Sequence, residues 1–96
     1  MKKKIKIAGI PYKVKQVNVI DESDYGVVRG KISYSKCKIS IKKNQPKGIK
    51  KETLIHEVVH GLLVEIGRND LSDDETFVQT LANGLMNTKG VFKLWK

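Results

Sequence analysis

Two histidines and a glutamate stand within five residues of one another, in the order His56, Glu57 and His60. On a helix, residues four apart share one face, so the two imidazoles can bind one tetrahedral Zn²⁺ through ring nitrogens. Glu57 lies about 100° further around that helix, beside the metal, where a base can take a proton from metal-bound water. The HExxH pattern therefore predicts a zinc metallopeptidase, with one zinc per chain and Glu57 as the general base.

A catalytic zinc needs a third protein ligand and one open position. Acidic residues follow the motif at Asp70, Asp73, Asp74 and Glu75. We favour Glu75 as the ligand, because it begins the next predicted helix and because a carboxylate suits the positive end of a helix. Asp74 is the second choice. Glu75 has a competing role as the acid of a capping box begun by Ser72.

An extended HExxHxxGxxH site is excluded. Such a site needs a glycine three residues after His60 and a third histidine three residues later, and the sequence has Leu63 and Ile66 there. The alternative to a metal site is that both histidines are ordinary surface or core residues. Their spacing, the glutamate between them and the acidic segment behind them favour a metal site.

Two helices are predicted to position these side chains. In residues 50–66 apolar side chains recur at spacings of three and four and form one stripe, and Gly67 is a natural stop. A second helix is predicted over 74–87, with an inner stripe of Phe77, Val78, Leu81 and Leu85.

The first half of the chain predicts strands. Ile5 and Ile7 alternate with lysines, and similar alternation follows near residues 12–17, 27–34 and 37–42. The last two segments flank a short connection and predict a β-hairpin. Strands followed by helices indicate an α+β fold, and 96 residues indicate a single domain over 1–96.

Composition narrows the class of protein. No apolar run approaches the roughly 20 residues that span a bilayer, and no leader pattern follows the basic start. The one cysteine, Cys37, excludes an internal disulfide and a cysteine-based zinc ribbon, and is read as an unreactive strand residue. We therefore expect a cytoplasmic protein without a membrane partner.

Charge is unevenly distributed along the chain. Residues 1–51 carry fifteen Lys or Arg against three Asp or Glu, a net of +12, whereas residues 52–96 carry four against seven. The basic half is either a well-solvated surface or a site of non-specific nucleic-acid contact. Few arginines and aromatic residues argue against base-specific recognition.

Other parts of the peptidase are less defined by the sequence. Three residues are candidates for stabilising the oxyanion of a peptide substrate, namely Tyr34, Tyr25 and Arg68. The strand 39–43 is a candidate for aligning a protein or peptide substrate by backbone pairing. Substrate identity cannot be read from this pattern.

The motif, the short acidic loop behind it and the helix that begins Asp74-Glu75 resemble the smallest gluzincin-type peptidases. These are the minigluzincins encoded by phages and prophages, distantly similar to ImmA/IrrE-type and SprT-like peptidases. The resemblance covers roughly residues 26–88. It implies a small antiparallel sheet of three to four strands packed on two helices, with His56, His60 and Glu75 as zinc ligands and Glu57 as base. A zinc ribbon and a helix-turn-helix, found in longer relatives, are missing from the pattern.

Two other classes of function stay open. The first is a catalytically silent module in which the same residues hold zinc structurally, which a fourth protein ligand would favour. The second is a basic protein associated with DNA, which binds through its lysine-rich half.

Overall fold

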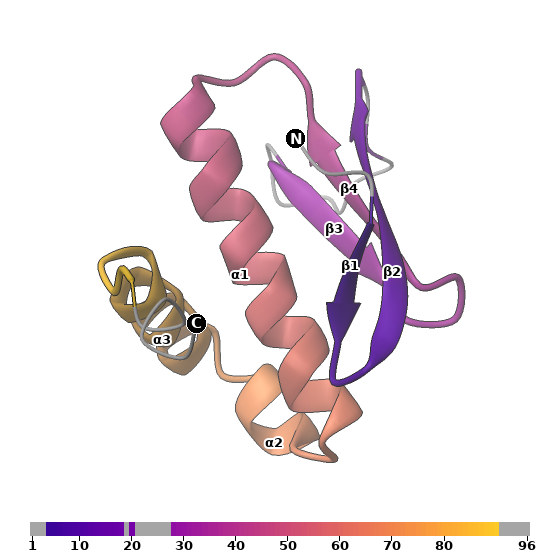
Figure 1. Cartoon of the computed structure of the whole chain (residues 1–96), viewed down its shortest axis with the longest axis vertical. Helices are drawn as coiled ribbons and strands as arrows, with labels where there is room; N and C mark the ends of the chain where they lie inside the picture. Colours follow the sequence, from indigo (N-terminus) through magenta and orange to yellow (C-terminus); the bar gives the residue numbers. More distant parts are fainter. Residues whose placement is uncertain (1–3, 19, 21–27, 91–96) are drawn as a thin grey trace.

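The alternating apolar and basic residues of the first half form a four-stranded sheet, and the second half forms three helices (Figure 1). The computed structural model describes residues 4–18, 20 and 28–90. The strands are β1 (Lys4–Ile7), β2 (Ile10–Val17), β3 (Gly30–Ser33) and β4 (Lys38–Lys42). The helices are α1 (Lys47–Glu65), α2 (Asn69–Ser72) and α3 (Glu75–Met86). The predicted α+β class is confirmed.

The sheet is mixed, not purely antiparallel as expected. Its strand order is β1-β2-β4-β3, with β1–β2 and β3–β4 antiparallel and β2–β4 parallel. β3 follows β2 in the chain but lies one strand position away from it in the sheet. The hairpin then returns β4 into the gap, so β4 runs parallel to β2. Alternation within a strand specifies which face is apolar but not which neighbour the strand pairs with, so the sequence did not reveal this.

The inner face of the sheet packs on α1. Its fully buried side chains include Tyr12, Ile39 and Ile41. Two glycines allow the helix and sheet to approach closely. A Cβ on Gly30 would lie 2.5 Å from Thr53, and a Cβ on Gly61 would lie 2.9 Å from Ile32. This close contact fixes α1, which carries both motif histidines, against β3.

Helix α1 separates the sheet from α3, which contacts no strand of the described part of the chain (Figure 1). A second, smaller core lies between the helices, where Val59 and Leu63 meet Val78 and Ala82. The helices are thus held by two apolar contacts on different sides of α1.

The predicted helix boundaries are close to the observed ones, with two differences. Helix α1 begins three residues early, at Lys47, directly after Pro46, which the sequence placed in a loop; proline is well tolerated at helix starts. The segment predicted as a polar connection contains the short helix α2. As expected, Gly67 ends the first helix, with a φ of +82° that favours glycine.

The predicted apolar stripes are only partly buried. Val78 of the second stripe is buried, but Phe77, Leu81 and Leu85 are exposed by 37%, 37% and 47%. On α1, Leu62 and Ile66 are likewise exposed. The reason is that, among the described elements, α3 contacts only helices, so these elements cover a narrower face of it than the pattern indicates.

Two smaller predictions are also corrected or limited. Cys37 lies in the β3–β4 turn with a φ of +49°, so it is not a strand residue. The tail 91–96 and Tyr25 lie outside the described residues. None of the helices in the described ranges is long and apolar enough to cross a membrane.

Candidate metal centre

The two motif histidines occupy a strip of α1 between its two buried faces. On one side, Thr53, Glu57 and Gly61 are buried on the face toward β3, and on the other Val59 and Leu63 pack toward α3. His56 and His60 lie between these faces and are only partly buried. The helical period therefore aims both imidazoles into the groove between the sheet and the later helices.

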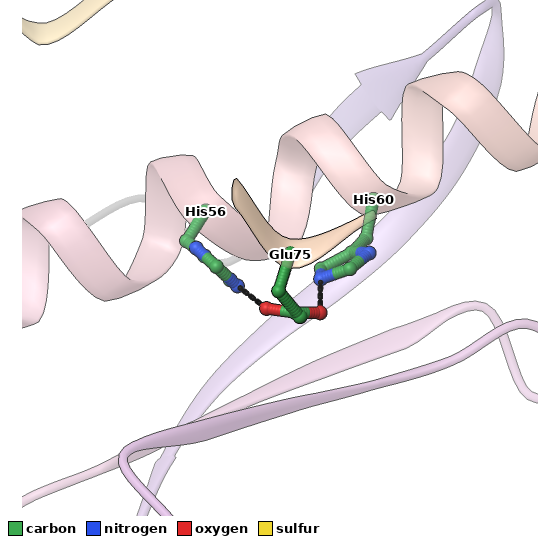
Figure 2. Close-up of side chains that lie close together, drawn as sticks. All are labelled: His56, His60 and Glu75. Carbon is green, nitrogen blue, oxygen red and sulfur yellow. Dashed lines mark ion pairs between the residues drawn. The ribbon is translucent and has the colours of Figure 1, made fainter. Parts of the chain in front are cut away.

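Glu75, the first residue of α3, completes the group (Figure 2). One carboxylate oxygen lies 3.2 Å from His56 Nε2, and the other lies 2.9 Å from His60 Nε2. The carboxylate is 68% exposed, so it reaches the histidines from the open side of the groove. The sequence predicted that His56, His60 and Glu75 lie together, and in the structure their side chains are in contact.

Asp74, the alternative third ligand, has another role. Its side chain caps α3 by accepting the backbone N–H of Phe77 at 3.0 Å. The predicted N-cap at Ser72 is therefore wrong, because α3 begins two residues later than that cap requires. With Asp74 at the cap, the Glu75 side chain is left to face the histidines.

Hydrogen bonds on the far side of each ring define how the imidazoles are protonated. His56 Nδ1 lies 2.9 Å from Gln79 Oε1, while Gln79 Nε2 lies 2.9 Å from Asn83 Oδ1 and 3.4 Å from a Glu52 oxygen. Because a carboxylate only accepts, the Gln79 amide must direct its NH₂ toward Glu52 and its oxygen toward His56. His56 Nδ1 is then the N–H donor, and Nε2 carries the lone pair.

His60 is oriented in the same way by Ser72. Its Nδ1 lies 3.0 Å from Ser72 Oγ, and that hydroxyl lies 3.5 Å from the His60 carbonyl oxygen. The hydroxyl can donate toward the carbonyl and accept from Nδ1–H. Each ring thus turns its Nε2 toward the Glu75 carboxylate, and Nε2 carries a lone pair when the ring is neutral.

At these distances the two Nε2 atoms and the carboxylate can pair through protons on the rings or bind one cation together. The ligand atoms of the three side chains all lie within 4.8 Å of one another. Ligands about 2.0–2.1 Å from a tetrahedral zinc stand about 3.3 Å apart, which is close to the 3.2 Å and 2.9 Å that separate the two Nε2 atoms from the carboxylate oxygens. The His56, His60 and Glu75 group can therefore hold a metal ion.

Glu57 lies beside the group but does not join it. It is 9% exposed, and burial raises the pKa of its carboxyl to about 7. The neighbouring His56 lowers this pKa and the Glu75 carboxylate raises it. A carboxyl with a pKa near neutrality, open to the same groove as the histidines, suits proton transfer.

The groove itself is formed by β3, α1 and the segment from α2 to α3. It has a volume of about 840 Å³, and its walls include Gly30, Ile32 and Tyr34 on the sheet side. Burial raises the pKa of Tyr34, the nearby Ser72 hydroxyl lowers it and the Glu57 carboxylate raises it again. Arg68 instead forms a two-pronged ion pair with Asp70 at 2.9–3.0 Å and does not line the groove.

Sequence reasoning missed Gln79 and Ser72. Gln79 follows Glu75 by four residues, so the helical period that directs Glu75 to the metal also directs Gln79 to the histidines. That spacing was a usable signal for Gln79. Ser72 carries no such signal, because its approach to His60 depends on the turn made by α2.

We expect Gln79→Leu to weaken metal-ion binding about 10- to 100-fold without removing a ligand, since the His56 ring loses the acceptor that fixes it. Competition with a chromophoric chelator measures this. Thr80→Leu, on an exposed neighbouring position, is the matched control. Equal affinities for wild type and Gln79→Leu would show that the amide does not orient the ligand.

Comparisons with protein-family models, with curated proteins and with solved structures found no match to this chain. The chemistry of the centre therefore follows only from its own residues. Within the described part of the chain these residues form one group of two imidazoles and one carboxylate that can bind a metal ion, next to a buried carboxyl of raised pKa.

Proposed function

We propose that this chain is a zinc-dependent peptidase. The observation that carries the proposal is the convergence of the His56 and His60 Nε2 atoms with the Glu75 carboxylate, beside the buried Glu57. Two imidazoles and one carboxylate form a typical catalytic zinc set, because they leave a fourth position open. The described residues offer no fourth ligand to this group, which favours a catalytic over a structural site.

A zinc ion held by these residues would supply a Lewis acid that makes water acidic and polarises a substrate carbonyl. Glu57 takes the proton from the attacking water and passes it to the departing amine. Its pKa of about 7 suits both transfers, because the carboxyl is neither fully ionised nor fully protonated near neutral pH. Gln79 and Ser72 hold the two imidazoles in the required orientation.

Tyr34 is the remaining candidate for stabilising the oxyanion. Its raised pKa keeps the hydroxyl protonated, so that it can donate a hydrogen bond into the groove it lines. Arg68 is less suited to this role, because Asp70 already occupies two of its donors.

The substrate is proposed to lie along β3. The strand first favoured for this role, near β4, is unsuitable because β4 pairs with both β2 and β3 and has no free edge. Among the described strands β3 pairs with β4 alone, and it lines the groove beside the histidines. An extended peptide adding to this edge would pass the metal group.

Elemental analysis and a cleavage assay test the proposal together. Protein purified without a metal-binding tag is expected to contain about one zinc per chain and to cleave unfolded protein substrates, with fragments identified by mass spectrometry. Glu75→Gln is expected to retain only traces of zinc. Asp73→Asn, which removes a neighbouring exposed carboxylate, is the matched control and keeps the metal.

Two results would decide against the proposal. No zinc in the wild type, even after dialysis against zinc, would rule out the metal centre. Full zinc occupancy without cleavage of any tested protein would favour the silent zinc-binding module instead.

A further inference from the structure

The face of the sheet that points away from α1 carries a continuous array of lysines. Strand register places Lys4, Lys13 and Lys38 side by side across β1, β2 and β4. The next row contains Lys15 on β2 and Lys31 on β3, both aligned with Ser40 of β4. Because residues two apart share a face, the array has seven members in the described strands. They are Lys4, Lys6, Lys13, Lys15, Lys31, Lys38 and Lys42.

This lysine face has no acidic counterpart in the part of the chain that the structure describes. Every described Asp and Glu lies within residues 52–75, on or between the helices. Of the described helices only α1 contacts the sheet, and it packs on the opposite, apolar face (Figure 1). Within its described residues the chain therefore carries the metal group on the helical side of the sheet and the lysine face on the other.

Two adjoining hollows lie on the lysine face where it meets the β3–β4 turn. One, of about 280 Å³, is lined by Lys31, Lys36 and Lys38, by Ser33 and Ser40, and by the apolar Val17 and Ile20. The other, of about 330 Å³, shares Lys36 and Lys38 and adds lysines of β1 and β2. Ammonium and hydroxyl groups together are the donors that bind phosphate oxygens.

We propose that the lysine face binds the phosphate backbone of double-stranded nucleic acid, independently of the metal centre. Lysines two apart on one strand stand about 7 Å apart and neighbouring strands about 4.8 Å apart, so the face presents charges at a density suited to a charged polymer. With lysine as its dominant donor, the face lacks the bidentate base contacts that arginine makes, and recognition is independent of sequence.

The composition of the face selects the duplex over other polyanions. Single-strand binding sites stack bases on aromatic rings, and the described residues of this face present none, since the Tyr12 ring is fully buried on the inner side. Membrane-binding surfaces combine basic residues with exposed apolar groups that enter the lipid. Here the exposed large apolar residues lie mainly on α1 and α3, away from the lysines.

Fluorescence anisotropy with a labelled 20-base-pair DNA duplex tests the proposal. The test variant Lys31→Gln/Lys36→Gln/Lys38→Gln is compared with Lys47→Gln/Lys51→Gln/Lys89→Gln, which removes the same charge from exposed positions outside the sheet. The first variant is expected to bind at least about tenfold more weakly near 0.1 M salt. Its slope of log affinity against log salt concentration should be shallower by about two to three. The control should change binding less than about twofold.

Three outcomes would overturn the proposal. The first is equal weakening by both triple variants, which would indicate general attraction to a net positive protein. The second is wild-type protein without measurable duplex affinity at about 0.05 M salt. The third is stronger binding to vesicles containing phosphatidylserine than to the duplex. Circular dichroism checks that both variants fold, and the zinc content of each, expected to be unchanged, separates this face from the metal centre.

Discussion

Glu57→Gln is expected to lower kcat/KM for peptide hydrolysis at least about a thousandfold while about one zinc per chain remains bound. The glutamine has nearly the same shape as the glutamate and fits the same buried position between Thr53 and Gly61. It cannot take a proton from water, so the general-base step is lost. The ligand group, formed by other side chains, stays complete.

Zinc content by elemental analysis and cleavage rates on one peptide substrate measure both halves of this prediction. Tyr34→Phe is the graded comparison, with an expected loss of about 10- to 1000-fold in kcat, because only an oxyanion donor is removed. Cleavage by Glu57→Gln at a rate close to wild type would contradict the assignment of the base, and would point to a contaminating protease or another proton acceptor.

The histidine pair was predictable because it depends only on the helical period. Once residues 50–66 form a helix, His56 and His60 must share a face, and tertiary packing only decides what they face. Glu75 was harder, because its place in the group depends on where α3 begins. The sequence predicted the cap at Ser72, whereas the observed cap is Asp74, and this cap explains why that neighbouring carboxylate is unavailable to the metal.

The topology of the sheet, unlike the histidine pair, could not be predicted from a local pattern. The strands were visible as alternation, but the order β1-β2-β4-β3 depends on a long connection whose path leaves no local pattern. In this order β4 is an inner strand and β3 is at an edge of the sheet, so the strand proposed to align the substrate changes from β4 to β3. It also aligned lysines from different strands into one face, which the net charge alone could not establish.

Glu57 is also expected to destabilise the metal-free protein, and Glu57→Gln to stabilise it. Burial raises the pKa of Glu57 from 4.5 to about 7 in the folded chain. The folded state therefore holds this proton more tightly than the unfolded state. The contribution of the protonated Glu57 carboxyl to the free energy of unfolding is fully present below about pH 4.5. It is lost as the pH rises through about 7. Above that pH, the ionised carboxyl costs roughly 3 kcal/mol.

Urea unfolding of chelator-treated wild type and Glu57→Gln at several pH values measures this effect. The variant is expected to be more stable by up to roughly 3 kcal/mol at pH 8, with the difference shrinking toward zero near pH 4.5. A difference that does not change with pH would mean that the carboxyl is not desolvated as its burial indicates. The pH-dependent result would mean that the residue proposed to carry the proton in hydrolysis lowers the stability of the metal-free fold, as expected where a buried charge is kept for chemistry.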